Sequence, residues 1–405
     1  MSERIFRPAL IGLVCLRLAM MVLLVSGIPH LIVKDGWYFH HGGDQGMMFD
    51  AAKSVLAGKP VYTYVGAGMP LVMAGLSWLF HADSYLHIVV PMVLINGFLL
   101  GSLSIVVMAR LARRLTGRFD LALLAAAVWT LLPYLFYALF GLHPDAALFR
   151  DSYVPFLFWA NGLSEGPSLF LYLLGVALVL KGLDERRAWP VAAAGLALGF
   201  ACVVRIHTAV PVAVLTGLLL LKREWRALTL LVGGMIVGFL PQSWYSHGYS
   251  GSAINIPYIQ NWLRLDERGH LWLDLKNTPF APKFLIENTL GIAQRHLGLA
   301  TAGLMLGAAG LFGLARFWRE RGWFKALLLF ASPVATWLFH AVTYVFASDP
   351  FRFTVPAFPL GTIAGVYTFF AARDLWLARR AAGALRAAAP GPASAGIRSA
   401  PERGS

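Results

Sequence analysis

Apolar stretches alternate with short polar ones along almost the whole chain of 405 residues. A helix needs about 20 apolar residues to cross a bilayer, and about ten stretches reach or approach that length. They are residues 9–33, 85–108, 121–142, 162–180, 188–204, 208–221, 227–244, 297–314, 326–346 and 355–371. A transmembrane barrel would show short alternating segments instead. The pattern predicts an all-α polytopic membrane protein, a bundle of about ten transmembrane helices within a range of about 8 to 11.

Composition agrees with this prediction. Hydrophobic residues make up 58% of the chain and charged residues only 13%, which is about half the charged share of a soluble protein. The formal net charge of +14 would suggest a nucleic-acid partner in a soluble protein. Here most lysines and arginines fall in loops on one side of the bundle, so the positive-inside rule accounts for the charge. We expect no nucleic-acid partner and both termini in the cytoplasm.

The segments between the predicted spans divide the chain into functional parts. Residues 1–371 form one transmembrane domain with outer loops at 34–70, 142–165 and 245–296, and the basic residues 372–405 form a disordered cytoplasmic tail. Residues 47–56 are helix-like, and 69–80 are apolar but too short to span, which predicts a re-entrant or interfacial helix. The third loop carries Trp262, Trp272 and leucines among charges, a pattern typical of interfacial helices. Arg17, inside the first span, is expected to extend outward to the cytoplasmic edge.

Polar residues gather in the outer loops and not along the span interiors. A transporter or pump needs ionisable residues near the middle of the membrane. The span interiors hold few such residues: Arg17, His87, His207 and His340. This favours an enzyme that works at the outer membrane–water boundary over a lipid transporter or flippase, which stays an alternative.

Asp44 is the first candidate for chemistry. It follows His40-His41-Gly-Gly, where glycines allow a ligand to approach the backbone. Its carboxylate could act as a general base on an acceptor hydroxyl or amine, or it could cap the helix that begins near Gln45. Asp50, six positions on, is a supporting or solvated group. His40, His41 and Asp44 could together ligate a divalent metal, although adjacent histidines lack the i, i+4 spacing of a helical metal site.

The other candidates lie at the outer ends of later spans. His143, Asp145 and Asp151 form a second acidic loop that could meet the first, or could be ordinary solvated residues. Glu165 stands at the mouth of a span, where a charge is costly unless it is paired, so we expect it to contact the substrate or link elements. Arg205 and Arg352 each lie at the end of an apolar span, and guanidinium groups match phosphate geometry. They could hold a lipid phosphate with help from His207, or anchor phospholipid head groups.

Five stretches, taken in chain order, resemble the GT-C superfamily of integral-membrane glycosyltransferases. The superfamily includes aminoarabinose, protein O-mannosyl and polyprenyl-phosphate-dependent mannosyl transferases. The stretches are Asp44 with the following GMMFDAAKSVLAGKPVY, Gly68-Met-Pro70, Leu163-Ser-Glu165-Gly-Pro167, Val204-Arg205-Ile-His207 and Phe351-Arg352-Phe353 with Pro356 and Pro359. Together these stretches extend over nearly the whole chain, up to about residue 371.

The resemblance implies an inverting glycosyltransferase in a bacterial inner membrane with a periplasmic active site. Asp44 would be the catalytic base, Arg352 with Arg205 would face the donor phosphate, and the donor would be a polyprenyl-phospho-sugar of undecaprenyl or decaprenyl type. The acceptor would be a glycan, a lipid or a protein. Gln45 stands where many relatives have a second acid, which weakens a metal requirement, and we expect no counterpart of the large soluble domain of some relatives. Another membrane ligase or polymerase that uses lipid-linked glycans stays an alternative.

Overall fold

The computed structural model describes most of the chain. The described residues are 3–26, 44–63, 66–136, 159, 164–253, 263–265, 271–273, 282–295, 297–342 and 354–388. Within them the chain is helical apart from one short β hairpin. The prediction of an all-α polytopic membrane protein is confirmed.

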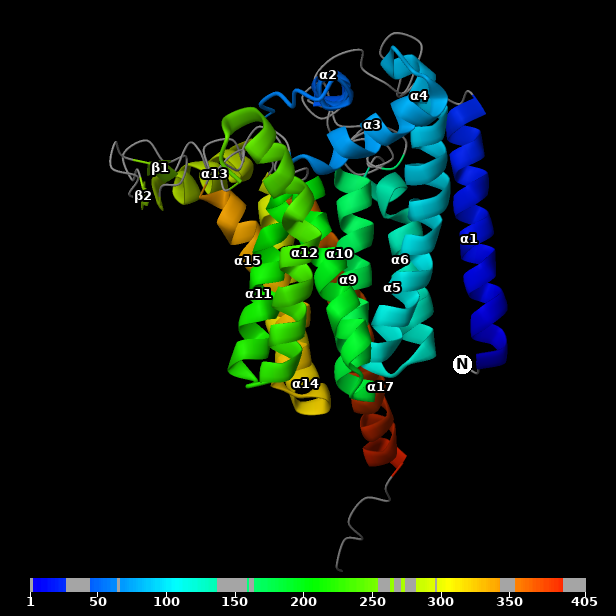
Figure 1. Ribbon diagram of the computed structural model, residues 1–405. Coiled ribbons are helices and arrows are strands. Elements are labelled where there is room, and N and C mark those ends of the chain that lie inside the picture. Colours follow the sequence, from blue (N-terminus) through cyan, green and yellow to red (C-terminus); the bar gives the residue numbers. More distant parts are fainter. Residues whose placement is uncertain are drawn as a thin grey trace, which may run out of the picture.

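An upright bundle of helices forms the body of the molecule (Figure 1). Its members are α1 (Glu3–Ser26), α4 (Tyr85–Val93) continuing through the π-helix η2 (Leu94–Leu100) into α5 (Gly101–Thr116), α6 (Phe119–Phe136), α9 (Glu165–Glu185), α10 (Ala188–Val204), α11 (Ala209–Leu221), α12 (Trp225–Ser250), α14 (Leu297–Arg321), α15 (Trp323–Ala341) and α17 (Phe358–Ala388). Within the described residues, each predicted span overlaps one of these helices. Within the described ranges, six helices are long and apolar enough to cross a membrane, and further apolar helices are shorter.

Glycines allow two of these helices to approach closely. Gly195 and Gly199 of α10 face Gly234 and Gly238 of α12, and a Cβ atom at any of the four would collide with the backbone of the other helix. Small residues at such positions are the usual means by which helices pack in lipid, where burying apolar surface from water provides no driving force between them.

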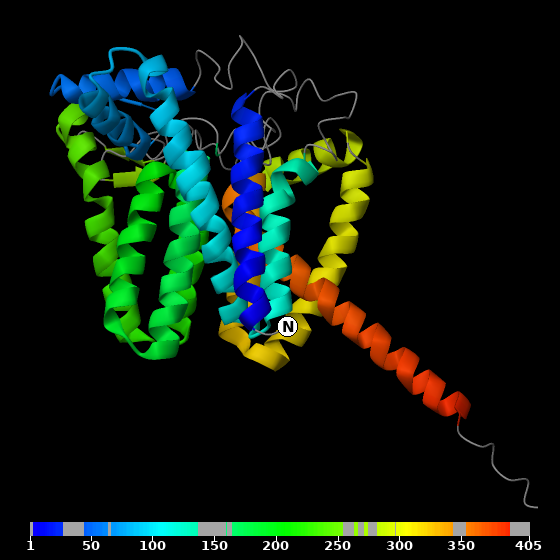
Figure 2. The same ribbon diagram turned by 90° about the vertical axis from the view of Figure 1, so that its right-hand side faces the viewer.

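Three further helices lie across one end of the bundle (Figure 1). They are α2 (Asp44–Leu56), α3 (Gly68–Phe80) and α13 (Pro282–Arg295). The first two match the helices predicted near 47–56 and 69–80. The N-terminus lies at the opposite end, where α17 projects beyond the other helices (Figure 2). We call the end that carries α2, α3 and α13 the capped end.

Two predicted segments differ from the structure. Residues of the third loop that were predicted to be helical form the antiparallel strands β1 (Leu263–Leu265) and β2 (Leu271–Leu273), with Leu263 opposite Leu273. Each strand holds only three residues, Leu-Arg-Leu and Leu-Trp-Leu, and a strand this short gives no periodic signal that would outweigh a composition typical of an interfacial helix. The predicted disordered tail from residue 372 is wrong in its first part, because α17 continues to Ala388.

Arg17 is also placed differently from its prediction. Its side chain is only 2% exposed, and its guanidinium lies 5.8 Å from the centre of the Trp159 ring. A Cβ atom at Gly101 would lie 3.3 Å from Arg17 Nη2. The absence of a side chain there leaves space for the arginine between α1 and the continuous helix of η2 and α5, so Arg17 is buried in the protein and does not extend to the membrane edge.

Candidate active site at the capped end

Asp44 is the first residue of α2, and its helix is fixed in place by the residue that follows it. Tyr85, at the start of α4, donates a hydrogen bond of 2.6 Å from its hydroxyl to Gln45 Oε1, and both side chains are buried. The ring of Phe49 packs against that of Tyr85 with centroids 6.0 Å apart. Asp44 itself is partly exposed. The carboxylate therefore sits at the accessible start of a helix whose first turn is anchored.

The sequence of α2 explains why it lies flat on the bundle end. Gln45, Met48, Phe49 and Ala52 are buried, and their i, i+3, i+4, i+7 spacing places them on one helix face. Met48, Phe49 and Ala52 enter an apolar cluster with residues of α3 and α4 and with Val204 at the end of α10. Val204 directly precedes Arg205, so one cluster joins the helix of Asp44 to the helix end that carries Arg205.

Asp50 lies on the other side of α2. Its Oδ1 is 2.9 Å from Lys53 Nζ, and its side chain is 70% exposed. An exposed carboxylate with a partner one turn away is solvated and has little structural consequence.

The start of α3 is held tightly against α10 and α12. A Cβ atom at Gly68 would lie 2.6 Å from Val204 Cα, and one at Gly66 would collide with the backbone of Val203. Between these glycines, the backbone N–H of Ala67 donates to Gln242 Oε1 at 2.8 Å. Only glycine allows this approach, which explains the Gly-x-Pro sequence at the start of the helix.

Glu165 and Arg205 form a buried ion pair where α9 begins and α10 ends. Arg205 Nη1 lies 2.9 Å from Glu165 Oε1, with the two side chains 7% and 0% exposed. The same nitrogen donates to Ser164 Oγ at 3.1 Å. Arg205 has an extended backbone, φ −149° and ψ 110°, between α10 and the short 3₁₀ turn η4 (Ile206–Thr208) that leads into α11. This break in the helix directs the arginine toward the start of α9.

His207, in that same turn, meets the end of another span. Its ring lies 4.8 Å from that of His340 near the end of α15. Asn288 of α13 donates a hydrogen bond of 2.7 Å to the carbonyl of Ala341, the next residue. The ends of α10 and α15 and the crossing helix α13 thus meet around two histidines.

The structure brings some of the predicted site residues together. Glu165, Arg205 and His207 lie in one region, and Asp44 stands on a helix that packs into the adjoining apolar cluster. His40, His41, His143, Asp145, Asp151 and Arg352 lie outside the described residues, so their roles stay predictions. Among the residues that are described, no group of three or more His, Cys, Asp or Glu side chains could hold a metal ion. The proposed His40–His41–Asp44 set is not tested by this finding.

Sequence reasoning missed the residues that hold the site in shape. Gln45, Tyr85 and Gln242 all make buried hydrogen bonds to distant parts of the chain. The sequence distinguishes Gln45 only because many relatives have an acidic residue at that position. A polar residue on the otherwise apolar face of α2 was the one available signal, because such a group must find a hydrogen-bond partner when it is buried.

No protein-family model and no curated protein sequence matches the chain. Solved structures of two membrane proteins share its fold. ArnT from Cupriavidus metallidurans, bound to undecaprenyl phosphate, aligns with a TM-score of 0.52 and 18% identity over 88% of this chain and 59% of its own. The Archaeoglobus fulgidus oligosaccharyltransferase, in complex with Zn and sulfate, aligns with a TM-score of 0.54 and 13% identity over 93% of this chain and 51% of its own.

A second structure of the Archaeoglobus protein is tethered to an acceptor peptide that contains the NVT sequon. It aligns with a TM-score of 0.52 and 12% identity, over 94% of this chain and 51% of its own. The chain therefore spans between 51% and 59% of the length of the proteins it resembles. At these identities the likeness shows a common fold.

Proposed function

We propose that this chain, which has the fold of the GT-C superfamily of membrane glycosyltransferases, is an inverting glycosyltransferase that uses a polyprenyl-phosphate-linked sugar. The observation that carries the proposal is the position of Asp44. Within this fold, a partly exposed carboxylate starts a helix that is anchored at the capped end and shares an apolar cluster with the helix end bearing Arg205.

The donor class is supported by the similar structures. ArnT was solved with undecaprenyl phosphate bound, which is the product that remains when a sugar leaves an undecaprenyl-phosphate donor. The exposed apolar side chains along the spans give this chain a surface for a long lipid tail. The acceptor is a glycan, a lipid or a protein.

In the proposed reaction, Asp44 removes a proton from an acceptor hydroxyl or amine. The oxygen or nitrogen attacks the anomeric carbon of the sugar, while the bond from that carbon to the phosphate oxygen breaks on the opposite face. The configuration inverts, and the bonding electrons leave with the polyprenyl phosphate. A phosphate leaving group needs less help from an acid than the sugar alcohol expelled by a glycosidase with two carboxylates, so one base and a cation suffice.

Arg205, with Arg352 and His207, would stabilise the charge on the departing phosphate. Arg205 is held at the end of α10 by Glu165 and Ser164, so its guanidinium is fixed before a donor arrives. Glu165 is then a positioning residue, which agrees with the linking role expected for it. Asp145, Asp151, His41 and His143 are proposed to support the acceptor side, whereas Asp50, which is exposed and paired with Lys53, is given no part in the reaction.

The proposed location is a bacterial inner membrane. The capped end would face the periplasm and both termini the cytoplasm, because the loops at the opposite end carry most of the basic residues. Residues 1–371 would form the single catalytic domain.

The test compares two carboxylates on the same helix. Purified protein in lipid nanodiscs receives a panel of undecaprenyl-phospho-sugars with a membrane-extract acceptor, and release of undecaprenyl phosphate and sugar transfer are measured. Asp44→Asn should lower the rate by about 10²–10⁴-fold, while Asp50→Asn, which removes an exposed acid six residues away, should leave it within about twofold. Full activity of Asp44→Asn would exclude the base role. Movement of the intact lipid-linked sugar across the membrane without chemical transfer would show a flippase instead.

A further inference from the structure

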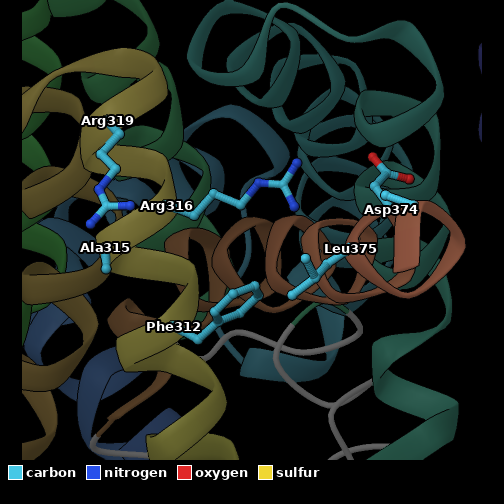
Figure 3. A pocket seen from close by; sticks show the side chains of 7 residues that line it. Phe312, Ala315, Arg316, Arg319, Asp374 and Leu375 are labelled. Carbon is cyan, nitrogen blue, oxygen red and sulfur yellow. The ribbon is translucent and has the colours of Figure 1, made fainter. Parts of the chain in front are cut away.

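A cavity of about 600 Å³ opens between α14 and α17 (Figure 3). It lies toward the ends of these helices that point away from the capped end (Figure 1). Its lining is Phe312, Ala315, Arg316, Arg319, Asp374, Leu375 and Ala378. We call this cavity the α14–α17 groove. It lies far along both helices from the residues proposed for sugar transfer, so the transfer reaction does not account for it.

The two acidic groups beside the groove are already neutralised. Asp374 is 2.9 Å from Arg118 Nη1 and 2.7 Å from Arg373 Nη2. Glu320 accepts hydrogen bonds of 2.8 Å from Arg316 Nε and 2.9 Å from the hydroxyl of Tyr367. Neither carboxylate is left to balance a further cation.

Arg319 is that further cation. Its side chain is exposed on α14, beside the groove, and no hydrogen bond or ion pair joins it to any described residue. Figure 3 shows its guanidinium lying along α14 next to Ala315, with Arg316 extending from the same helix toward α17. Two arginines of one helix thus border the groove, and one of them has its charge uncompensated among the described residues.

The rest of the lining is apolar and continues onto an exposed apolar surface. Phe312 and Leu375 are each 37% exposed. Beside them on α17, Trp376 is 56% exposed, and its ring lies 5.4 Å from the guanidinium carbon of Arg380. Tryptophan beside arginine is typical of a membrane–water interface. The groove therefore opens where lipid head groups meet acyl chains.

We propose that the α14–α17 groove binds one anionic phospholipid, with its phosphate at Arg319 and an acyl chain along Phe312 and Leu375. An uncompensated guanidinium above an apolar floor at the interface matches a phosphate joined to a hydrocarbon chain. The cavity volume lies within the range of about 300–1,000 Å³ that is usual for small-ligand sites. A second anionic group on the head group would be attracted by the arginines of α17.

The test measures lipid retained by the intact protein. The protein is reconstituted into nanodiscs of phosphatidylcholine with phosphatidylglycerol and then released from them. Native mass spectrometry counts the phosphatidylglycerol molecules that stay bound to the protein. Arg319→Gln should lower its occupancy by about fivefold, the factor expected for one basic residue near a lipid surface. The matched control is Arg226→Gln, which removes an exposed arginine from the first turn of α12, a helix that does not line the groove.

A second variant fills the groove without changing its charge. Ala378→Trp places a large ring in the lining and should lower phosphatidylglycerol occupancy to a similar extent, while thermal unfolding and elution volume stay close to those of the wild type. Equal losses in the Arg319 and Arg226 variants would show general attraction to the basic end and overturn the site. Unchanged occupancy in Ala378→Trp, equal retention of phosphatidylcholine, or competition by inorganic phosphate alone would each overturn it too.

Discussion

Arg205 and Glu165 form an ion pair of 2.9 Å between the end of α10 and the start of α9, with both side chains buried. Taking two charges out of water costs several kcal/mol per ion, and their attraction offsets this cost only when the geometry is good. A pair of this kind fixes which helix ends meet. If either residue is replaced, the other keeps a buried charge without that counterion. The contribution of the pair to stability can therefore be measured.

Glu165→Gln should destabilise the protein by about 3–5 kcal/mol, because the buried charge of Arg205 would lose its carboxylate. Thermal unfolding in detergent measures the loss. The control is Asp184→Asn, which breaks the partly exposed pairs with Arg114 at 3.0 Å and Lys325 at 3.4 Å and should cost about 1 kcal/mol or less. In the double variant Glu165→Gln/Arg205→Met, stability should be higher than in Glu165→Gln alone. Equal losses for the Glu165 and Asp184 variants would contradict this account.

Arg205→Lys separates the structural role of Arg205 from its proposed catalytic role. A lysine keeps the charge that compensates Glu165 but cannot present a forked set of donors to a phosphate. We expect unfolding close to that of the wild type and a transfer rate lower by about tenfold or more. Arg205→Met should lose both properties. If the lysine variant transferred sugar at the full rate, Arg205 would act only through its ion pair.

Gly68→Ala should weaken the attachment of α3 to the bundle. The new Cβ atom would lie 2.6 Å from Val204 Cα, which is backbone and cannot rotate away. Overpacking of this kind costs about 1–3 kcal/mol, which thermal unfolding would detect. Gly75→Ala, on the same helix with no atom within 4 Å of the added carbon, should be neutral or stabilise by up to about 1 kcal/mol. A drop in stability in both variants would indicate a general intolerance of α3 to alanine.

Tyr85→Phe should loosen the start of α2. The change removes the donor to Gln45 and leaves a buried acceptor unsatisfied, at a cost of about 1–3 kcal/mol. Amide hydrogen exchange in α2 should become faster, and sugar transfer slower, because Asp44 would be held less firmly. Tyr172→Phe removes an equivalent buried hydroxyl, which contacts Ser332 Oγ at 3.3 Å in the bundle. Exchange in α2 that responded equally to both substitutions would rule out a local effect of Tyr85.

Hydropathy predicted most of the architecture, because the length of an apolar run limits whether it can cross a bilayer. The spans and the short helix α3 were found in this way, and α2 was predicted from the helix-like residues 47–56. The β hairpin was missed since each strand holds only three residues, too few for a periodic signal. The helix to Ala388 was missed since composition indicated disorder, although alanine, leucine and arginine favour a helix.

The features of the candidate site divide in the same way into those that the sequence predicts and those that only the tertiary structure shows. The sequence by itself determined that Asp44 lies in a polar segment between spans and that Glu165, Arg205 and His207 stand at the ends of spans. Only the tertiary structure decided that Arg205 meets Glu165, that Tyr85 holds Gln45, and that Arg17 turns inward to Trp159. The physical reason is that an apolar run specifies a helix but not its neighbours. In lipid, neighbours are chosen by close contacts between small residues and by pairing of buried polar groups, and these depend on residues that lie far apart in the chain.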